Sequence, residues 1–447
     1  MENCLIDSKN QISCLSDVLD GYQLSLFNRG NATNRQELRL LSLFSGCGGM
    51  DIGFEGGFIC NVKSVPEKSD WIDTIVNDHW VRLRKNRFHT IFANDILREA
   101  QISWTGYMSR FGEDAGVFHN QSIVDLVKLH KSGYAIFPNN VDIVTGGFPC
   151  QDFSVAGKRL GFDSNKMHDG SIRNSDEPSE ESRGKLYYWM KQVIDIVKPK
   201  MFVAENVKGL VNLGNVKDII QKDFSEAGDN GYIVLPPQVL DAGNFGVPET
   251  RERVIFIGIC KSALNEVALR TLEGEIIPEE YSPYPNPTHN HTANNVDLLP
   301  PVVCRDIFSG LKEPQDSNDL SQKYYSKAKY MGKHCQGQNE INLDGLAPTI
   351  RSEHHGNIEY RRLSHSHGGI ILDELEQGLN ERRLTPRECA LIQTFPPDYP
   401  FVSYQGYSKR FRLSPSGAYK VIGNAVPPML AYNIAKRIEQ VWPLYFE

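Results

Sequence analysis

Residues 38–49 read Leu-Arg-Leu-Leu-Ser-Leu-Phe-Ser-Gly-Cys-Gly-Gly, an apolar run that ends in a glycine-rich turn. The apolar run from Leu38 to Phe44 predicts a buried strand, and the glycines predict a tight turn into a helix. Such a turn lets the backbone approach a nucleotide-like cofactor at the carboxyl edge of a parallel sheet. It can equally be plain strand-to-helix geometry, and it lacks the lysine of a phosphate-binding loop.

Three more apolar segments continue this pattern. They predict strands at Val141–Thr145, Met201–Ala204 and Val254–Ile257. Before the second of these, a helix ended by Pro199 carries its apolar residues on one face: Leu186, Met190, Val193, Ile194 and Val197. Strands that alternate with helices indicate an α/β fold with a largely parallel, doubly wound, Rossmann-like sheet.

The pattern divides the chain into four parts. Residues 1–37 are polar and weakly periodic, which favours a peripheral arm, and residues 38–260 hold the predicted sheet. In residues 261–382 prolines, histidines and polar loops replace the alternation, which predicts a separate, smaller lobe. Residues 383–447 return to helices, with a capping box at Thr385 and later helices at 414–422 and after Pro428.

Composition sets outer limits on the class of protein. The 447 residues are 40% hydrophobic and 23% charged, which excludes collagen, coiled-coil and wholly disordered chains. No run approaches the roughly 20 apolar residues of a membrane span, and no secretory signal is visible, so we expect a cytoplasmic protein. Nine cysteines without C-x-x-C spacing favour reduced thiols over a metal site or disulfides. The net charge of −7 leaves nucleic-acid binding open, provided that positive charge is concentrated locally.

The loop after the second predicted strand carries a cysteine. Cys150 follows Pro149 just past the strand end, where a thiolate would be an accessible nucleophile. The alternative is a small buried apolar side chain, which describes most free cysteines. We prefer that alternative for a separate set of thiols: Cys4, Cys14, Cys60, Cys260 and Cys304.

Two further clusters lie at the ends of predicted strands. Glu205 and Asn206 end the third strand, so Glu205 and Cys150 are expected to face one crevice as acid and nucleophile. Arg251 and Arg253 share one face at the start of the fourth strand, and their guanidinium groups suit carbonyl and phosphate oxygens. A satisfied polar strand end and a solvated charge run are the plain alternatives.

The order of these motifs resembles the DNA cytosine carbon-5 methyltransferases, which use S-adenosylmethionine. The resemblance covers residues 38–260 and 382–440. It rests on six collinear segments: 43–49, 147–151, 205–207, 251–253, 383–388 and 423–428. It implies a methyltransferase sheet, with residues 261–382 as the target-recognition lobe.

The resemblance also implies a mechanism. The Cys150 thiolate attacks carbon 6 of cytosine while Glu205 protonates ring N3, which makes carbon 5 able to take the methyl group. The target must be flipped out of the duplex for this chemistry. Arg253 is expected to bind the base, Arg251 to support the active-site network and Asn206 to orient the loop.

For the cofactor, the resemblance implies stacking of Phe44 on adenine and binding of the ribose by Asp95. The remaining expected contacts are Ser45, Gly46, Cys47, Gly48, Gly49, Ile96, Ser122, Ile123, Pro149, Leu186, Asn424 and Val426. An insertion at 59–89 leaves Glu67 as a rival ribose acid. Ser122 also stands near the position of the family's adenine-binding acid, and Glu249 replaces a family glutamine.

Residues expected to contact double-stranded DNA fall in two regions. The segment after Cys150 is long and charged, and we interpret it as a mobile loop that closes on DNA. In the lobe, residues 321–338 interleave lysines with tyrosines and hold no acid, and residues 351–367 add arginines and histidines. The candidates are Gln151, Ser154, Lys158, Lys327, Lys329, Thr349, Arg351, Arg361 and Arg362.

Three alternatives remain. An amino-methyltransferase needs an acid or amide before a Pro-Pro-aromatic run, which no Pro-Pro pair here provides. A tRNA-directed relative shares the base chemistry, although a large lobe favours duplex DNA, and a DNA-binding protein without activity would not need Cys150 and Glu205 together. We expect a monomeric bacterial modification enzyme that has no obligate protein partner and no membrane association. The usual context of such an enzyme is a cognate restriction endonuclease encoded nearby.

Overall fold

The central feature of the computed structural model is an eight-stranded sheet with the order β10-β12-β8-β7-β1-β5-β6, in which β9 also pairs with β12. The structure describes residues 36–67, 69–111, 115–149, 186–212, 215–293, 295–353 and 355–447. The strands are β1 (Leu38–Leu43), β5 (Phe88–Asn94), β6 (Phe118–His119), β7 (Ile143–Gly147), β8 (Met201–Val207), β9 (Tyr232–Val234), β10 (Gln238–Asp241) and β12 (Glu252–Cys260). The five strands from β8 to β6 run parallel, and β12 is antiparallel to β8. The α/β fold with a largely parallel sheet is therefore confirmed.

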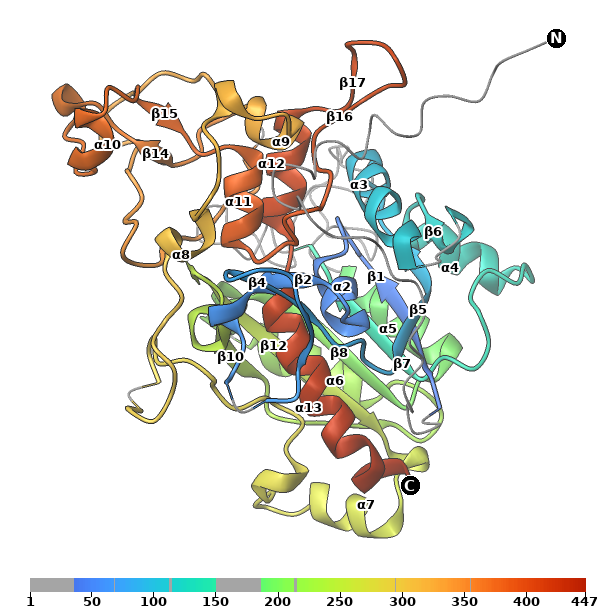
Figure 1. The fold of residues 1–447 in the computed structure, drawn as a ribbon. Coiled ribbons are helices and arrows are strands. Elements are labelled where there is room, and N and C mark those ends of the chain that lie inside the picture. Colours follow the sequence, from blue (N-terminus) through green and yellow to red (C-terminus); the bar gives the residue numbers. More distant parts are fainter. Residues whose placement is uncertain are drawn as a thin grey trace.

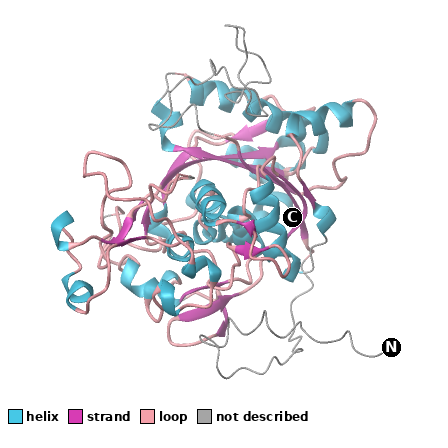
Figure 2. Cartoon of the chain, turned by 90° about the horizontal axis from the view of Figure 1, so that it is seen from above, coloured by secondary structure: helices cyan, strands magenta, loops and turns pink. Residues whose placement is uncertain are grey.

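Alternate side chains along the strands point to opposite faces of the sheet and belong to two separate apolar layers. On β8, Met201 and Val203 belong to one buried cluster, and Phe202 and Ala204 belong to the other. The second cluster contains residues of α4 (Ile123–Lys131), α5 (Leu186–Val197) and α6 (Val216–Ser225). The first contains residues of α2 (Gly49–Glu55), α3 (Arg98–Met108) and α13 (Pro428–Phe446). Helices thus cover both faces of the sheet, as Figure 2 shows from above.

The insertion after the cofactor turn forms a unit of its own. Strands β2 (Ile59–Asn61), β3 (Ile72–Ile75) and β4 (Trp80–Leu83) pair antiparallel in the order β2-β4-β3. The insertion ends where β5 begins, and β5 pairs directly with β1. The insertion therefore does not separate β1 from β5, and Asp95, which follows β5, stays beside the glycine turn that follows β1.

The C-terminal part returns to the sheet. Helix α11 (Pro386–Ile392) begins at the predicted capping box, in which Thr385 and Glu388 cap each other. Helix α12 (Pro415–Asn424) follows, and α13 then packs against α2 where Gly53 leaves no room for a side chain beside Ala431. Figure 1 shows α13 running along the sheet domain.

The lobe lies beside these helices and contains short elements. They are α8 (Cys304–Phe308), α9 (Leu320–Lys323), β13 (Ala347–Pro348), β14 (Tyr360–Arg362), α10 (Leu372–Glu376) and β15 (Arg382–Arg383). Strand β13 pairs with β11 (Glu249–Thr250) of the sheet domain. The start of the predicted lobe behaves differently, because α7 (Glu266–Leu272) packs on α13 and Asn265 N–H donates to Tyr445 O at 2.9 Å. None of the helices in the described ranges is long and apolar enough to cross a membrane.

Candidate active site

The carboxyl ends of β1, β5, β7 and β8 open into a cavity of about 730 Å³. This is the sheet edge at which the sequence predicted a cofactor and a reactive crevice. Of the predicted cofactor contacts, Phe44, Ser45, Gly46, Gly49, Asp95, Ile96, Ser122, Ile123, Pro149, Leu186, Asn424 and Val426 line it. Of the predicted catalytic residues, Glu205 and Arg253 line it.

Cys47 and Gly48 shape the turn from behind the cavity wall. The Cys47 thiol is buried and donates to Val421 O at 3.3 Å, and burial raises the pKa of this thiol strongly. Gly48 has a φ of +81° and lies against the Trp104 ring, so a side chain here would meet both backbone strain and a clash. These two residues therefore support the turn rather than line the cavity.

Gly49 is the point where the two halves of the chain meet. A Cβ built on it would lie 2.1 Å from Val426 O, a distance that no packed side chain tolerates. The glycine therefore permits residues 424–426 to approach the first turn of α2. This contact completes the cavity from two segments that are far apart in the sequence.

Asp95 projects from the end of β5 beside the glycine turn. Its Oδ2 accepts from Gly46 N–H at 3.0 Å, and its Oδ1 accepts from Leu97 N–H at 2.8 Å. Burial raises the pKa of Asp95, while these two N–H groups and the charge of Lys420 act to lower it. The rival acid, Glu67, is exposed beyond β2 and is not part of the cavity wall.

Two charged residues of the cavity wall were not predicted. Lys420 of α12 and Glu99 of α3 both line it, and Lys420 Nζ lies 3.9 Å from Glu99 Oε2. A signal for Lys420 exists in the sequence, because it stands one helical turn before Asn424 and so shares its helix face. Glu99 has no comparable signal, since its position depends on how α3 packs against α12.

The part of the cavity wall at which the resemblance predicts adenine binding is polar at Gln121 and Ser122. Ser122 caps α4, where its hydroxyl accepts from Val124 N–H at 3.3 Å. Gln121 also lines the wall. The Gln121–Ile123 stretch of the wall is thus polar but without the acid that the resemblance led us to look for.

Glu205, the predicted acid, lines the cavity at the end of β8 and forms an ion pair. Arg253 Nε is 2.6 Å from Glu205 Oε1, and both side chains are about nine-tenths buried. In the sheet Glu205 pairs with Gly147, whose Cβ, if present, would lie 2.8 Å from Glu205 Oε2. Burial raises the pKa of the Glu205 carboxyl, and the charges of Arg253 and Arg251 act in the opposite direction.

Asn206 fastens the neighbouring strand end. Its Nδ2 donates to Phe148 O at 3.1 Å, two residues before Cys150. The amide therefore holds the backbone that leads into the predicted nucleophile loop. Cys150 itself lies outside the described residues, as do Gln151, Ser154 and Lys158.

Arg251 joins three parts of the protein. It is fully buried and donates to Ile350 O at 3.0 Å, to Gly423 O at 2.8 Å and to Ala425 O at 2.7 Å. Glu249 accepts from Ile350 N–H at the same junction. Arg251 thus ties the sheet domain to the lobe and to the late motif, in keeping with a supporting role.

The predicted DNA contacts of the lobe fall into two groups. Lys327 and Lys329 are exposed. Thr349 is half-buried and donates to Thr250 O, while Arg351 NH2 lies 3.0 Å from Glu359 Oε1. These four residues lie at or near the surface, with Arg351 partly engaged inside the lobe.

Arg361 and Arg362 are placed differently. Both side chains are more than nine-tenths buried and form ion pairs with Glu374. Arg362 NH2 also lies 2.6 Å from Glu313 Oε2. Breaking such buried pairs to free a guanidinium would leave buried charges uncompensated. Their burial therefore speaks against the predicted contacts with DNA bases. The two residues were predicted as contacts because a sequence cannot distinguish a buried arginine from one that reads a groove.

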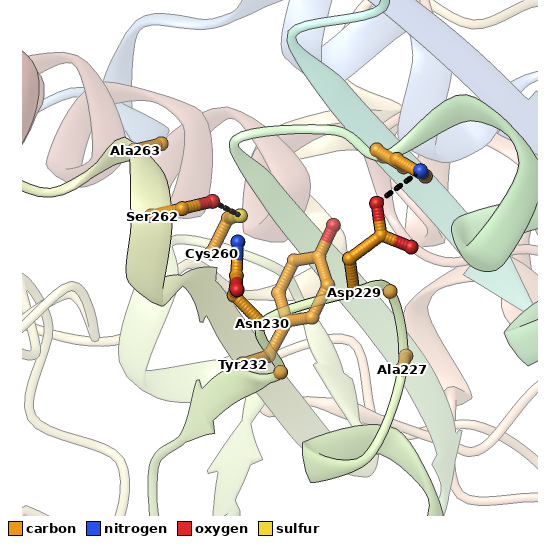
Figure 3. A pocket seen from close by; sticks show the side chains of 10 residues that line it. Ala227, Asp229, Asn230, Tyr232, Cys260, Ser262 and Ala263 are labelled. Atoms are coloured by element: carbon orange, nitrogen blue, oxygen red, sulfur yellow. Dashed lines mark hydrogen bonds and ion pairs between the residues drawn. The ribbon is translucent and has the colours of Figure 1, made fainter.

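A second, smaller pocket of about 170 Å³ lies at the opposite end of β8 (Figure 3). It is lined by Lys198, which pairs with Asp229, and by Cys260, whose sulfur is 3.3 Å from Ser262 Oγ. Lys198 precedes the start of β8, whereas Glu205 stands near its end. The length of this strand therefore separates the pocket from the catalytic edge.

The fold and the site together define a methyltransferase-type α/β enzyme, with its cavity at the carboxyl edge of the sheet and the Glu205 carboxylate in the cavity wall. The family model for C-5 cytosine-specific DNA methylases matches residues 38–440. The chain belongs to this family, and the resemblance found in its motifs is confirmed.

Individual relatives agree with this assignment. The chain is 29% identical over 411 residues to the type II methyltransferase M.BsuRI of Bacillus subtilis, covering 90% of this chain and 79% of the relative. It is 30% identical over 409 residues to M.BspRI of Lysinibacillus sphaericus, covering 90% and 82%. Among solved structures, the Entamoeba histolytica methyltransferase EhMeth shares the fold, with a TM-score of 0.52, 15% identity and coverage of 92% and 99%.

Proposed function

We propose that this enzyme transfers the methyl group of S-adenosylmethionine to carbon 5 of a flipped-out cytosine in a specific double-stranded DNA sequence. The reaction proceeds through a covalent bond between Cys150 and carbon 6 of the ring. The observation that carries the proposal is the Glu205–Arg253 ion pair in the cavity wall, because Glu205 lies on β8, next to β7, the strand that leads to Cys150. The names of the type II relatives support a role as the modification enzyme of a restriction-modification system.

Glu205 is suited to act on ring N3. Burial raises the pKa of its carboxyl, which favours the protonated form that can donate to a base nitrogen. Arg253 orients the carboxyl through Oε1 and leaves Oε2 facing Gly147. Protonation of N3 draws electrons from the ring as Cys150 adds to carbon 6, and loss of the carbon-5 proton later releases the thiolate.

The cavity fits an adenosine-type cofactor. It offers an aromatic ring at Phe44, a carboxylate at Asp95 with unused acceptor capacity, and close backbone approach at Gly46. S-Adenosylmethionine supplies the methyl group as a sulfonium. Phe44 would stack on the adenine, Asp95 would accept from the ribose hydroxyls, and Asn424 would hold the methionine end.

Substituting Asp95 with alanine is expected to raise the KM for S-adenosylmethionine by roughly 10- to 100-fold, about 1.4–3 kcal/mol for a charge-assisted contact. The turnover number should change less, because the contact binds cofactor and transition state alike. Since burial raises the pKa of Asp95, cofactor affinity should fall as pH drops, from a higher pH than for an ordinary aspartate. Equilibrium binding of S-adenosylmethionine at a series of pH values measures the loss of affinity and its pH dependence. The affinity of the Asp95→Asn variant should not change with pH over this range.

Glu67→Ala is the matched control for this substitution. It removes the rival carboxylate from an exposed position, so cofactor affinity is expected to stay unchanged. If Glu67→Ala weakens binding and Asp95→Ala does not, then the ribose acid is Glu67, within the insertion, and not Asp95.

Neutralising Lys327 and Lys329 is expected to weaken binding to all DNA sequences and to reduce the salt dependence by about one unit of slope per lysine. Both side chains are exposed, so the loss should come from phosphate contacts rather than from folding. Arg351→Ala should instead act on particular sites, by ~1–3 kcal/mol if it reads a guanine. A uniform loss in the Arg351 variant would exclude base reading by that residue.

The substrate and its sequence can be tested together. Transfer of labelled methyl groups to bacterial DNA but not to tRNA is expected, and bisulfite sequencing of plasmid DNA from expressing cells would give the methylated site. Exchange of the lobe for that of a relative should move methylation to the relative's site. An unchanged site after the exchange would place the reader elsewhere. We further propose that the enzyme acts as a cytoplasmic monomer, and the neighbouring genes would reveal a cognate endonuclease.

A further inference from the structure

Between α11 and α12 the chain forms a hairpin that has no part in the function proposed above. Strands β16 (Ser403–Tyr404) and β17 (Phe411–Leu413) pair antiparallel around a loop at residues 405–410. Figure 1 shows this hairpin projecting at the top of the view, between α9 of the lobe and α3 of the sheet domain. It is therefore a protruding element beside the lobe.

The base of the hairpin is held by aromatic rings. Tyr404 and Phe411 stack with their centroids 5.3 Å apart, and Phe411 meets Tyr324 edge-on at 5.2 Å. The hydroxyls of Tyr324 and Tyr404 are hydrogen-bonded. In the loop, Gln405 N–H donates to Arg410 O at 2.8 Å. An anchored base and a closed turn make the hairpin a defined arm rather than a loose loop.

The arm carries positive charge without compensation. Lys409, Arg410 and Arg412 are exposed, and within the described ranges none of them has an ion pair. No aspartate or glutamate occurs in the sequence between Asp398 and Glu439. In a chain of net charge −7, such a run concentrates positive charge locally.

The arm continues a positive surface of the lobe. Tyr324, which packs on the arm, belongs to the acid-free run 321–338. We define the lobe's basic surface as the four exposed lysines of that run, which likewise have no ion pair among the described residues: Lys323, Lys327, Lys329 and Lys333. Tyr407 at the tip of the arm is fully exposed, and its hydroxyl is of the kind that contacts phosphate or sugar oxygens.

The arm also stands at the rim of the catalytic cavity. Strand β17 ends at Leu413, and the residues that follow it, Ser414, Ser416 and Gly417, line the cavity from the start of α12. A duplex that delivers a base into this cavity would therefore come close to the arm. Positive charge at such a position meets the phosphates that flank the target base.

We propose that the β16–β17 hairpin is a DNA-binding arm that contacts the phosphate backbone beside the flipped cytosine and extends the basic surface of the lobe. The inference rests on the proposed action on duplex DNA. It assigns to residues 403–413 affinity for DNA of any sequence, whereas the choice of site remains with the lobe.

The test uses the full-length enzyme with Lys409→Ala/Arg410→Ala and a random-sequence duplex of about 30 base pairs as probe. Two phosphate contacts contribute about 1.8 units to the slope of log K against log salt. The slope is therefore expected to fall by about two units, and Kd at about 0.1 M salt to rise about 10- to 100-fold. Hydroxyl-radical footprinting on a methylatable duplex should lose protection on one flank, while the methylated site stays the same.

Two controls isolate the charge and its position. Lys409→Arg/Arg410→Lys keeps both charges and should retain the wild-type slope. Lys261→Ala/Arg270→Ala removes the same charge beside α7, near the bottom of Figure 1, and should also leave the slope unchanged. Affinity for S-adenosylmethionine should match the wild type in all three variants, because α12 is untouched.

An unchanged salt slope and an unchanged footprint in the Lys409→Ala/Arg410→Ala variant would overturn the proposal that the hairpin binds DNA. Weaker DNA binding accompanied by loss of cofactor affinity would overturn it too, because the hairpin would then act as a brace for α12. A wild-type enzyme that fails to bind or methylate any duplex would instead refute the proposed function itself.

Discussion

Replacing Cys150 with serine is expected to abolish methyl transfer while leaving cofactor binding and the fold intact. A hydroxyl is a far weaker nucleophile than a thiolate at neutral pH, so the step that activates carbon 5 does not occur. Asn206 holds the backbone at Phe148, and this bond does not involve the thiol. Loss of labelled methyl transfer, with unchanged affinity for S-adenosylmethionine, measures the effect.

The covalent step has its own readout. DNA that contains 5-fluorocytosine should trap the wild-type enzyme as an adduct stable to denaturation, because fluorine cannot leave as the proton does. The serine variant should form none. Cys47→Ala is a suitable control, since the buried Cys47 thiol has a raised pKa and lies behind the cavity wall. An adduct with the serine variant, or none with the wild type, would rule out Cys150 as the nucleophile.

Replacing Glu205 with glutamine is expected to lower the turnover number by about 10²- to 10⁴-fold, the usual range for loss of a general acid. Glutamine keeps the shape of the side chain and can still accept from Arg253, but it cannot transfer a proton to ring N3. Binding of DNA and of cofactor should remain within a few-fold of the wild type. Single-turnover methylation with saturating DNA separates the chemical step from binding.

Glu252→Gln provides the matched control. This residue lies next to Arg253 in the sequence but is half-exposed and pairs with Lys208 at 2.7 Å, away from the cavity wall. It should leave the turnover number unchanged. Full activity of Glu205→Gln would remove the proposed acid from the mechanism, and equal losses in both variants would point to a general electrostatic effect.

Much of the fold follows from patterns within short stretches of sequence. The apolar run at 38–44 became β1, which ends at Leu43, and the helix with its apolar face from Leu186 ended at Val197, just before Pro199. The capping box at Thr385 formed as predicted. These features depend on side chains within a few residues of each other, so the sequence alone was sufficient to predict them.

The sequence did not predict the direction of each strand or which distant segments pack together. The strand at 254–257 was predicted, but its antiparallel pairing with β8 was not, because a strand's apolar pattern is the same in both directions. The packing of α7 on α13 likewise depends on a contact between residues far apart in the chain. Residues 261–272 therefore sit with the sheet domain, although composition alone grouped them with the lobe.

For the site, strand and turn patterns in the sequence were enough to predict which residue types stand at the ends of the parallel strands. They therefore predicted the carboxylate and the glycine turn that share one cavity. Which charged side chains are free to contact a ligand depends instead on the packing of distant segments. It buried Arg361 and Arg362 against Glu374, brought Lys420 and Glu99 into the cavity wall, and left Lys409 and Arg410 exposed without ion pairs. The reason is physical: the free energy of a charged side chain depends on its solvation and its partners, and distant segments of the chain supply both.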